Sequence, residues 1–309
     1  MKNMKKTYNW CIHLLVLSIT LISCETNDKQ SDSTIESPLR GSDTVFCDES
    51  IYTCFNNAMP VYQKAFPDAH ITLFSKNARS SMAELFSEKT KSIIVARNYL
   101  PDEDSLLKQS GNSFQKIHIA NDGLVFFVSK DYPIDTLNMN QLTDYISGKI
   151  RLSMYFQKMK SEPILLIPGA QSSEYSNAIS FFSQLSHSAK NIAKFINSRD
   201  SIVFEVLKGK SIGLGYLSYV QKNPLLKSLR IGYIDSTGKR IPPQIVHQGF
   251  IIQNKYPFGI PIIAYLKEKR QNLPWGFATF MEKDPNIQKV LLDCGLIPVF
   301  AKYNLIQED

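Results

Sequence analysis

The amino-acid sequence predicts an α/β fold with two lobes, on three observations. Short β-like runs alternate with helical ones from residue 44 onward, which favours parallel strands joined by helical crossovers. A further series of the same kind follows the first, and the end of the chain adds strands and helices that would return to the first series. We therefore expect two lobes, each a mixed, mostly parallel sheet flanked by helices, with a ligand cleft between them.

The chain begins with a segment typical of an export signal. Three lysines among the first six residues precede an apolar stretch over residues 10–22, which is shorter than the about 20 apolar residues that a membrane helix needs. The stretch ends in Leu21-Ile22-Ser23-Cys24. This motif resembles the bacterial lipobox, whose cysteine becomes the lipid-modified first residue of the mature protein. We expect residues 1–23 to be a lipoprotein signal peptide and Cys24 to carry the lipid; the alternative is that Cys24 only lies near a signal-anchor helix.

The next segment, residues 24–40, is predicted to be a flexible tether. Its residues are almost all polar, so it buries too little apolar surface to fold, whereas residues 41–309 are enough for two lobes. The net charge of the whole chain is +7 and falls to about +4 once the three lysines leave with the signal. Because this charge is spread and no basic stripe with interleaved aromatic residues occurs, we expect no nucleic-acid partner.

The first α/β series follows from hydrophobic periodicity. Strands are expected at residues 44–47, 70–74 and 92–96, and helices at 51–66, 81–88 and from 101 onward. Two further strands are expected at 116–120 and 123–128, separated by the polar pair Asn121-Asp122.

The second series and the C-terminal return complete the predicted lobes. Helices are expected at 141–147, 175–185 and 202–207, and strands at 164–167 and 212–216. The end of the chain is predicted to hold buried strands at 250–252 and 259–264 and amphipathic helices at 275–282 and 287–292.

Three of the five cysteines belong to the folded part, namely Cys47, Cys54 and Cys294. An odd number excludes a fully paired framework, so these residues are expected to be small buried apolar side chains, with a Cys47–Cys54 bridge as the alternative. No cysteine pair has the spacing of a zinc site, and the five histidines are scattered. We therefore expect neither a metal nor a cofactor.

Several segments are similar, in the same order, to those of periplasmic solute-binding proteins of phosphate ABC importers. These are VFCDES at 45–50, IIVAR at 93–97, IANDGL at 119–124 and SIGLGY at 211–216, followed by YPFGIP at 256–261, WGF at 275–277 and CGLIP at 294–298. The resemblance covers almost all of the mature chain. It implies a type II two-lobed binding protein with a discontinuous first lobe, here residues 41–123 plus 248–309, and a second lobe at 124–247.

The resemblance also implies a function. The protein would be a lipid-anchored monomer of the cell envelope, in the periplasm or at the cell surface, and not an enzyme. It would capture an oxyanion, phosphate before others, and deliver it to an ABC permease in the membrane. The alternatives are another oxyanion such as sulfate or molybdate, a sensory or structural surface lipoprotein, and a serine hydrolase.

Two predicted helix starts carry chemistry that suits an anion. Asp48, Glu49 and Ser50 lie where a strand ends and a helix begins, and Ser172 and Ser173 precede another helix in the same way. Helix N-termini offer free backbone N–H groups and a positive dipole to an anion. For each serine alone, N-capping is the more ordinary role, so the signal is the pair of helix starts, one from each lobe. The arginine that the family carries shortly before the second start is absent here.

Arg97 ends the predicted strand at 92–96, where a cleft residue would lie. Its planar guanidinium suits bidentate contact with a tetrahedral oxyanion. The alternative is a surface arginine paired with Asp102 or Glu103.

Asp122 and Gly123 lie at the expected crossover between the lobes. Phosphate keeps a proton near neutral pH, since its second pKa is about 6, and it can donate this proton in a hydrogen bond to a carboxylate. Sulfate has no such proton, so the like charge of the carboxylate would disfavour its binding. Gly123 would allow close backbone approach. Asp48 could serve in this role instead, and either carboxylate could simply cap a turn.

Two near-matches to enzyme motifs fail. Gly209-Lys210-Ser211 lacks the first glycine of a P-loop, and Gly169-Ala170-Gln171-Ser172 has its serine one place too late for G-x-S-x-G.

Overall fold

The computed structural model describes residues 37–159, 161–183, 185, 192–268 and 270–301. The predicted signal peptide, Cys24 and the tether up to residue 36 lie outside these residues. The chain divides into two units at residue 36, and all of the described residues belong to the second unit, residues 37–309. No helix in this described part is both long and apolar enough to cross a bilayer.

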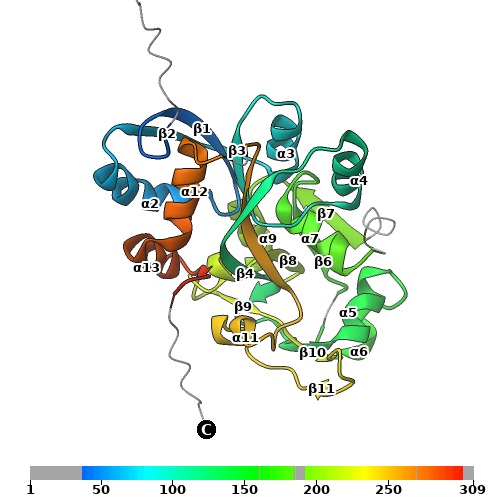
Figure 1. The fold of residues 1–309 in the computed structure, drawn as a ribbon. Coiled ribbons are helices and arrows are strands. Elements are labelled where there is room, and N and C mark those ends of the chain that lie inside the picture. Colours follow the sequence, from blue (N-terminus) through cyan, green and yellow to red (C-terminus); the bar gives the residue numbers. More distant parts are fainter. Residues whose placement is uncertain (1–36, 160, 184, 186–191, 269, 302–309) are drawn as a thin grey trace, which may run out of the picture. The chain divides into compact units, whose positions relative to one another are not determined.

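The fold is two-lobed, and a sheet with the strand order β2-β1-β3-β12-β4-β8-β6-β7 runs through both lobes (Figure 1). Its strands on the side of the first lobe are β1 (Gly41–Asp48), β2 (Ala69–Lys76), β3 (Ser92–Val95) and β12 (Gly259–Leu266). Those on the side of the second lobe are β6 (Ile164–Pro168), β7 (Ala193–Ile196) and β8 (Ser211–Tyr216). Strand β1 pairs in parallel with β2 and β3, and β6 pairs in parallel with β7 and β8.

Strand β4 (Gln115–Ser129) joins the two parts of the sheet. It pairs antiparallel with β12 up to Gly123 and with β8 from Leu124 onward. Strands β9 (Leu226–Ser228) and β13 (Ile297–Pro298) also pair with it. The predicted division of the chain into lobes remains a proposal, which this change of partners supports.

The predicted break at Asn121-Asp122 is wrong, because β4 is one continuous strand. Asn121 pairs with Pro261 on one side and Ile297 on the other. One oxygen of the buried Asp122 carboxyl group accepts hydrogen bonds from two backbone N–H groups, so this polar side chain is accommodated inside the strand.

The predicted helices occur in the predicted order with shifted ends. The first lobe carries α2 (Tyr52–Ala65), α3 (Ala78–Phe86), α4 (Pro101–Ser110), α12 (Leu273–Lys283) and α13 (Pro285–Asp293). The second lobe carries α5 (Met139–Ile146), α6 (Leu152–Tyr155), α7 (Ser173–Phe181), α9 (Arg199–Leu207) and α10 (Leu217–Val220). The short helices α6 and α10 were not predicted. A small sheet of β11 (Arg240–Ile241), β10 (Arg230–Ile234) and β5 (Thr136–Asn138) lies apart from the main one. Helix α3 begins three residues earlier than predicted, because the Asn77 side chain accepts a hydrogen bond from the backbone N–H of Ser80.

The strand predicted over residues 250–252 is wrong, since these residues belong to helix α11 (Gln248–Ile252). His247 caps this helix by accepting a hydrogen bond from the N–H of Gly249 at 3.0 Å. An apolar run of three residues fits a helix as well as a strand, so periodicity could not separate them.

One apolar cluster extends from the first lobe into the second. Its packing is tight where Phe127 of β4 crosses β8. A Cβ atom added to Gly213 would lie 2.4 Å from Cζ of Phe127, so the ring occupies the space that any side chain there would need.

A disulfide joins Cys54 of α2 to Cys294, the residue that ends α13, over a sequence separation of 240. The expectation of unpaired cysteines is therefore wrong for Cys54 and Cys294, and so is its alternative, a Cys47–Cys54 bridge. Cys47 is buried with a free thiol, and burial, reinforced by Asp48, raises the pKa of that thiol well above its usual value. The partners Cys54 and Cys294 come from opposite ends of the folded chain, so their spacing in the sequence gave no sign of the pairing.

Candidate functional site

The end of β1 and the start of α2 form the first half of the site. The Asp48 carboxylate is fully buried; one oxygen accepts a hydrogen bond from the N–H of Ser50 at 3.0 Å and the other from the N–H of Ala96 at 3.1 Å. Asp48 thus ties the turn before α2 to the end of β3. Helix α2 has no side-chain N-cap, and the Ser50 hydroxyl points to the other lobe.

The end of β6 and the start of α7 form the second half. Ser172 is the N-cap of α7: its Oγ accepts from the N–H of Tyr175 at 3.1 Å and donates to the carbonyl of Pro168 at 2.6 Å. Ser173 is fully buried, and its Oγ lies 3.0 Å from Oγ of Ser50. The structure therefore brings two of the predicted hydroxyls together across the cleft and assigns the third to capping.

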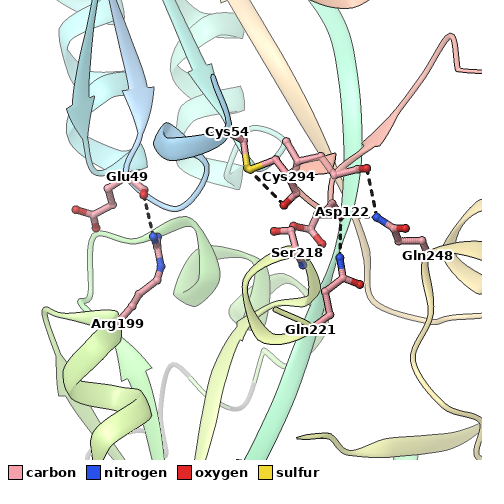
Figure 2. The surroundings of a disulfide bond; sticks show 10 residues. Glu49, Cys54, Asp122, Arg199, Ser218, Gln221, Gln248 and Cys294 are labelled. Carbon is pink, nitrogen blue, oxygen red and sulfur yellow. Dashed lines mark hydrogen bonds between the residues drawn. A yellow bond between two sulfur atoms is a disulfide. The ribbon is translucent and has the colours of Figure 1, made fainter. Parts of the chain in front are cut away.

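Sequence reasoning missed a partly buried ion pair beside these hydroxyls. The Glu174 carboxylate, 0% exposed, accepts a hydrogen bond from Nε of Arg199 at 3.0 Å. Nη1 of Arg199 donates to the carbonyl oxygen of Glu49 at 2.8 Å, which links α9 of the second lobe to the turn before α2 (Figure 2). Glu174 looked like an ordinary acidic residue in a first helical turn, and Arg199 follows the N-cap Ser198 of α9.

Further hydrogen bonds cross between the lobes next to this pair. Nδ2 of Asn177 donates to the carbonyl of Ala96 at 2.7 Å and to the Tyr216 hydroxyl at 2.8 Å. The Tyr216 hydroxyl donates to the same carbonyl at 3.2 Å. The backbone N–H of Arg79 donates to the carbonyl of Gln171 at 3.2 Å. These hydrogen bonds therefore join the two lobes directly.

Burial sets the protonation of the acidic groups here. It raises the pKa of Glu174, with Asp48 adding to the rise and Arg199 opposing it. Burial also raises the pKa of Glu49, again with Asp48 adding and Arg199 opposing. The site thus concentrates carboxyl groups around one arginine, an arrangement that ties its charge to pH.

Arg97 is 1% exposed, and its guanidinium is already paired. Nη1 and Nη2 donate to the two carboxylate oxygens of Glu103 at 2.7 and 2.8 Å, and Nη1 also donates to the carbonyl of Asn98. The alternative given for Arg97 was a surface arginine paired with Asp102 or Glu103. Arg97 does pair with Glu103, but the pair is buried.

Asp122 and Gly123 lie within β4. One oxygen of Asp122 accepts from the N–H groups of Gly123 and Ser218, at 2.7 and 3.2 Å. Burial raises the pKa of Asp122 to about 7, against the lowering effect of these bonds. Gly123 packs against α11, since a Cβ atom there would lie 2.7 Å from Cδ1 of Ile251. Asp122 thus joins β4 to the start of α10.

A groove of about 380 Å³ opens beside the two helix starts. Its lining residues come from both lobes and include Ser50, Arg199 and Lys222, together with both cysteines of the Cys54–Cys294 disulfide. Figure 2 shows this disulfide and Arg199. Hydroxyl and cationic groups, together with the acidic residues Glu49 and Asp200, therefore border the pair formed by Ser50 and Ser173. No group of three or more His, Cys, Asp or Glu side chains within the described ranges could hold a metal ion.

The sequence model of a protein family described as the PBP superfamily domain matches residues 32–284 of this chain. The chain belongs to the PBP superfamily. No curated protein matches the sequence. This PBP chain is similar in fold to a Clostridium perfringens protein described as a phosphate ABC transporter substrate-binding protein with bound phosphate: 17% identity, 84% of this chain and 100% of that one covered, TM-score 0.69. It is also similar to an ABC-type phosphate transport receptor from Vibrio cholerae, at 14% identity over 82% of this chain and 99% of that one, with a TM-score of 0.64. The family and the fold are those of solute-binding proteins.

Proposed function

We propose that this PBP chain is a lipid-anchored binding protein that captures an oxyanion, inorganic phosphate before others, and delivers it to an ABC importer. The observation that carries the proposal is the meeting of two helix starts from different lobes, with the Oγ atoms of Ser50 and Ser173 3.0 Å apart. An anion that enters between them would contact both lobes at once and hold them together.

The groups at this point suit an anion. Helices α2 and α7 have 14 and 9 residues, and both direct their N-terminal ends to the site. The N-terminus of a helix carries about half a positive charge and unpaired N–H groups. Ser50 and Ser173 add hydroxyl donors, and Arg199 adds a guanidinium, the group that binds phosphate oxygens in pairs.

Phosphate fits better than sulfate because the site also holds acceptors. Asp48 lies directly before the Ser50 turn, and its carboxylate can accept the proton that phosphate keeps near neutral pH. Sulfate has no such proton and would meet an unpaired like charge. The phosphate-related descriptions of the proteins from Clostridium perfringens and Vibrio cholerae support the same ligand.

The proposed contacts differ from the sequence-based set. Ser50 and Ser173 are direct contacts, supported by the turn that contains Asp48 and Glu49, and Arg199 takes the role first considered for Arg97. The others act around the site: Ser172 caps α7, Arg97 is paired with Glu103, and Asp122 and Gly123 position β4 between the lobes.

The envelope location remains part of the proposal. A lipid on Cys24 and a flexible tether would hold the monomeric protein close to its permease and raise the effective concentration there. Cells fed a labelled fatty acid should label the protein, and the variant Cys24→Ser should lose the label. A label that persists in Cys24→Ser would disprove this anchor.

Thermal melting of the purified protein with phosphate, sulfate, molybdate and an uncharged sugar tests the ligand. Phosphate at a hundred times its Kd should raise the free energy of unfolding by about 2.7 kcal/mol. Ser50→Ala and Ser173→Ala should weaken this effect, whereas Ser180→Ala, on α7 but bonded only to the carbonyl of Ser176, serves as the control. If sulfate or molybdate stabilises the protein more than phosphate does, that anion is the preferred ligand. If none of the anions stabilises the protein, oxyanion binding is refuted.

A further inference from the structure

The carboxylate of Glu174 lies inside the anion site proposed above. It is in the first turn of α7, fully buried, and holds two of the groups that would bind a ligand. One oxygen accepts from Nε of Arg199 at 3.0 Å, and the other lies 3.5 Å from Oγ of Ser173. The protein thus places a negative charge of its own where an oxyanion would be bound.

The charged and titratable groups around Glu174 come from several elements. Arg199 of α9 is the cation in contact with it. Asp48 at the end of β1 acts on it from the first lobe, and Glu49 is linked to it through Arg199. The charge of Glu174 also contributes to the raised pKa of Tyr216 in β8 and of Asp122 in β4. With Asp48, Glu49 and Glu174 all ionised, Arg199 cannot balance them, and a dianion would add further like charge.

We propose that Glu174 is an internal competitor of the ligand that makes anion binding depend on a proton. When Glu174 is ionised, it occupies Arg199 and Ser173. When it is protonated, it releases the Arg199 guanidinium to the incoming anion and can donate its own O–H. Binding is then accompanied by the uptake of one proton from water onto the Glu174 carboxyl group. This inference rests on the proposed function.

The sign of the pH effect follows from linkage. Burial already raises the pKa of Glu174, and a bound anion nearby raises it further. Between the two pKa values the complex holds one more proton than the free protein, so affinity falls as pH rises, by up to about tenfold per pH unit. Below both values the effect disappears.

The test compares the Kd of phosphate for the wild type and for Glu174→Gln by calorimetry from pH 5 to pH 8.5. Because both proteins meet the same mixture of phosphate species, the ratio of the two Kd values cancels the titration of phosphate itself. We expect a ratio near 1 at the acidic end and tighter binding by Glu174→Gln, by about tenfold or more, at the basic end. Glu205→Gln, an exposed position on the same helix as Arg199, is the matched control and should follow the wild type.

Proton uptake gives a second measurement. Binding heats in buffers with different ionisation enthalpies should show uptake of a proton by the wild type and less uptake by Glu174→Gln. Glu174→Ser, which removes the carboxyl group altogether, repeats both comparisons if Glu174→Gln does not fold.

The outcomes separate this inference from the function on which it rests. A Kd ratio that stays near 1 at all pH values would overturn the role of Glu174 and leave phosphate binding intact. Weaker binding by Glu174→Gln at every pH would make the carboxylate a ligand contact and also overturn the inference. If neither protein binds phosphate at any pH, the proposed function fails, and the inference fails with it.

Discussion

The buried Arg97–Glu103 pair leads to a sharp prediction for the variant Glu103→Gln. This change keeps the shape of the side chain and removes its charge. Arg97 is 1% exposed and donates to both carboxylate oxygens of Glu103, and the backbone N–H of Leu100 donates to one of them at 2.9 Å. Without the carboxylate, a guanidinium remains buried with only one good acceptor from this side chain.

The size of the effect follows from this burial. Breaking a buried ion pair from one side costs about 3–5 kcal/mol, because the remaining charge is left uncompensated. Glutamine retains one acceptor oxygen, so we expect the lower end, about 3 kcal/mol. Arg79, which also pairs with Glu103, is partly exposed and can turn to Asp102 and to water, so it adds little.

Urea denaturation at pH 7 measures the change, with Asp104→Asn as the control. Asp104 follows Glu103 in the first turn of α4 and pairs with Lys108, but its side chain is 48% exposed. Both variants lose the same favourable contact with the helix dipole, and Asp104→Asn should cost less than about 1 kcal/mol. A difference between the two variants below about 1 kcal/mol would refute the buried pair and make Arg97 available to a ligand again.

Three further predictions concern packing, the disulfide and pH. Gly213→Ala should lower the free energy of unfolding by about 1–3 kcal/mol in urea, because the added Cβ would lie 2.4 Å from Cζ of Phe127. Reduction of Cys54–Cys294 by a dithiol should lower it by about 2–5 kcal/mol in thermal melts, since the bond closes a very long loop. Asp122→Asn should gain stability relative to the wild type as pH rises from about 4 to about 7. Burial raises the pKa of Asp122 to about 7 in the folded state, so the wild type is fully stabilised below the unfolded pKa and loses this stability on the way up.

Each of these has its own control. Gly259→Ala should change stability little, because its Cβ would lie 3.6 Å from the nearest Ile251 atom; an equal cost at both glycines would contradict the packing argument. A protein with both Cys54 and Cys294 replaced by alanine should not respond to the dithiol. If the stability difference between Asp122→Asn and the wild type is the same at pH 4.5 and pH 8, Asp122 does not titrate as described.

Much of the fold could be predicted because most core elements leave a clear pattern of apolar residues in the sequence. Runs such as Ile93 to Val95 and the apolar end of β4 are buried on both faces, and this leaves continuous apolar stretches in the sequence. The errors fall where local pattern and tertiary pairing disagree. Asp122 looks like a strand breaker, but one of its carboxylate oxygens accepts a hydrogen bond from the N–H of the distant Ser218, and nothing near Asp122 in the sequence shows this.

The site was predictable only in part, for the same reason. The two helix starts could be found because each follows a strand after a short turn, with Ser50 two residues beyond β1 and Ser173 five residues beyond β6, and this pattern is local in the sequence. The ion pair could not be found, because Arg199 and Glu174 are 25 residues apart and each has an ordinary local explanation. The sequence lacks the arginine that the resembled family carries before the second helix start, and the guanidinium beside the two serines comes from the start of α9.

The pairing of β12 with both β3 and β4 also constrains the order in which the chain can fold. The sheet of the first lobe lacks an interior strand until residues 259–266 have been made, and the Cys54–Cys294 bond needs residue 294. Through most of its synthesis, the N-terminal part therefore has strands with an open edge and no closed core. A chain in that condition can still be threaded through a membrane, and it completes its first lobe only after nearly all of it has emerged.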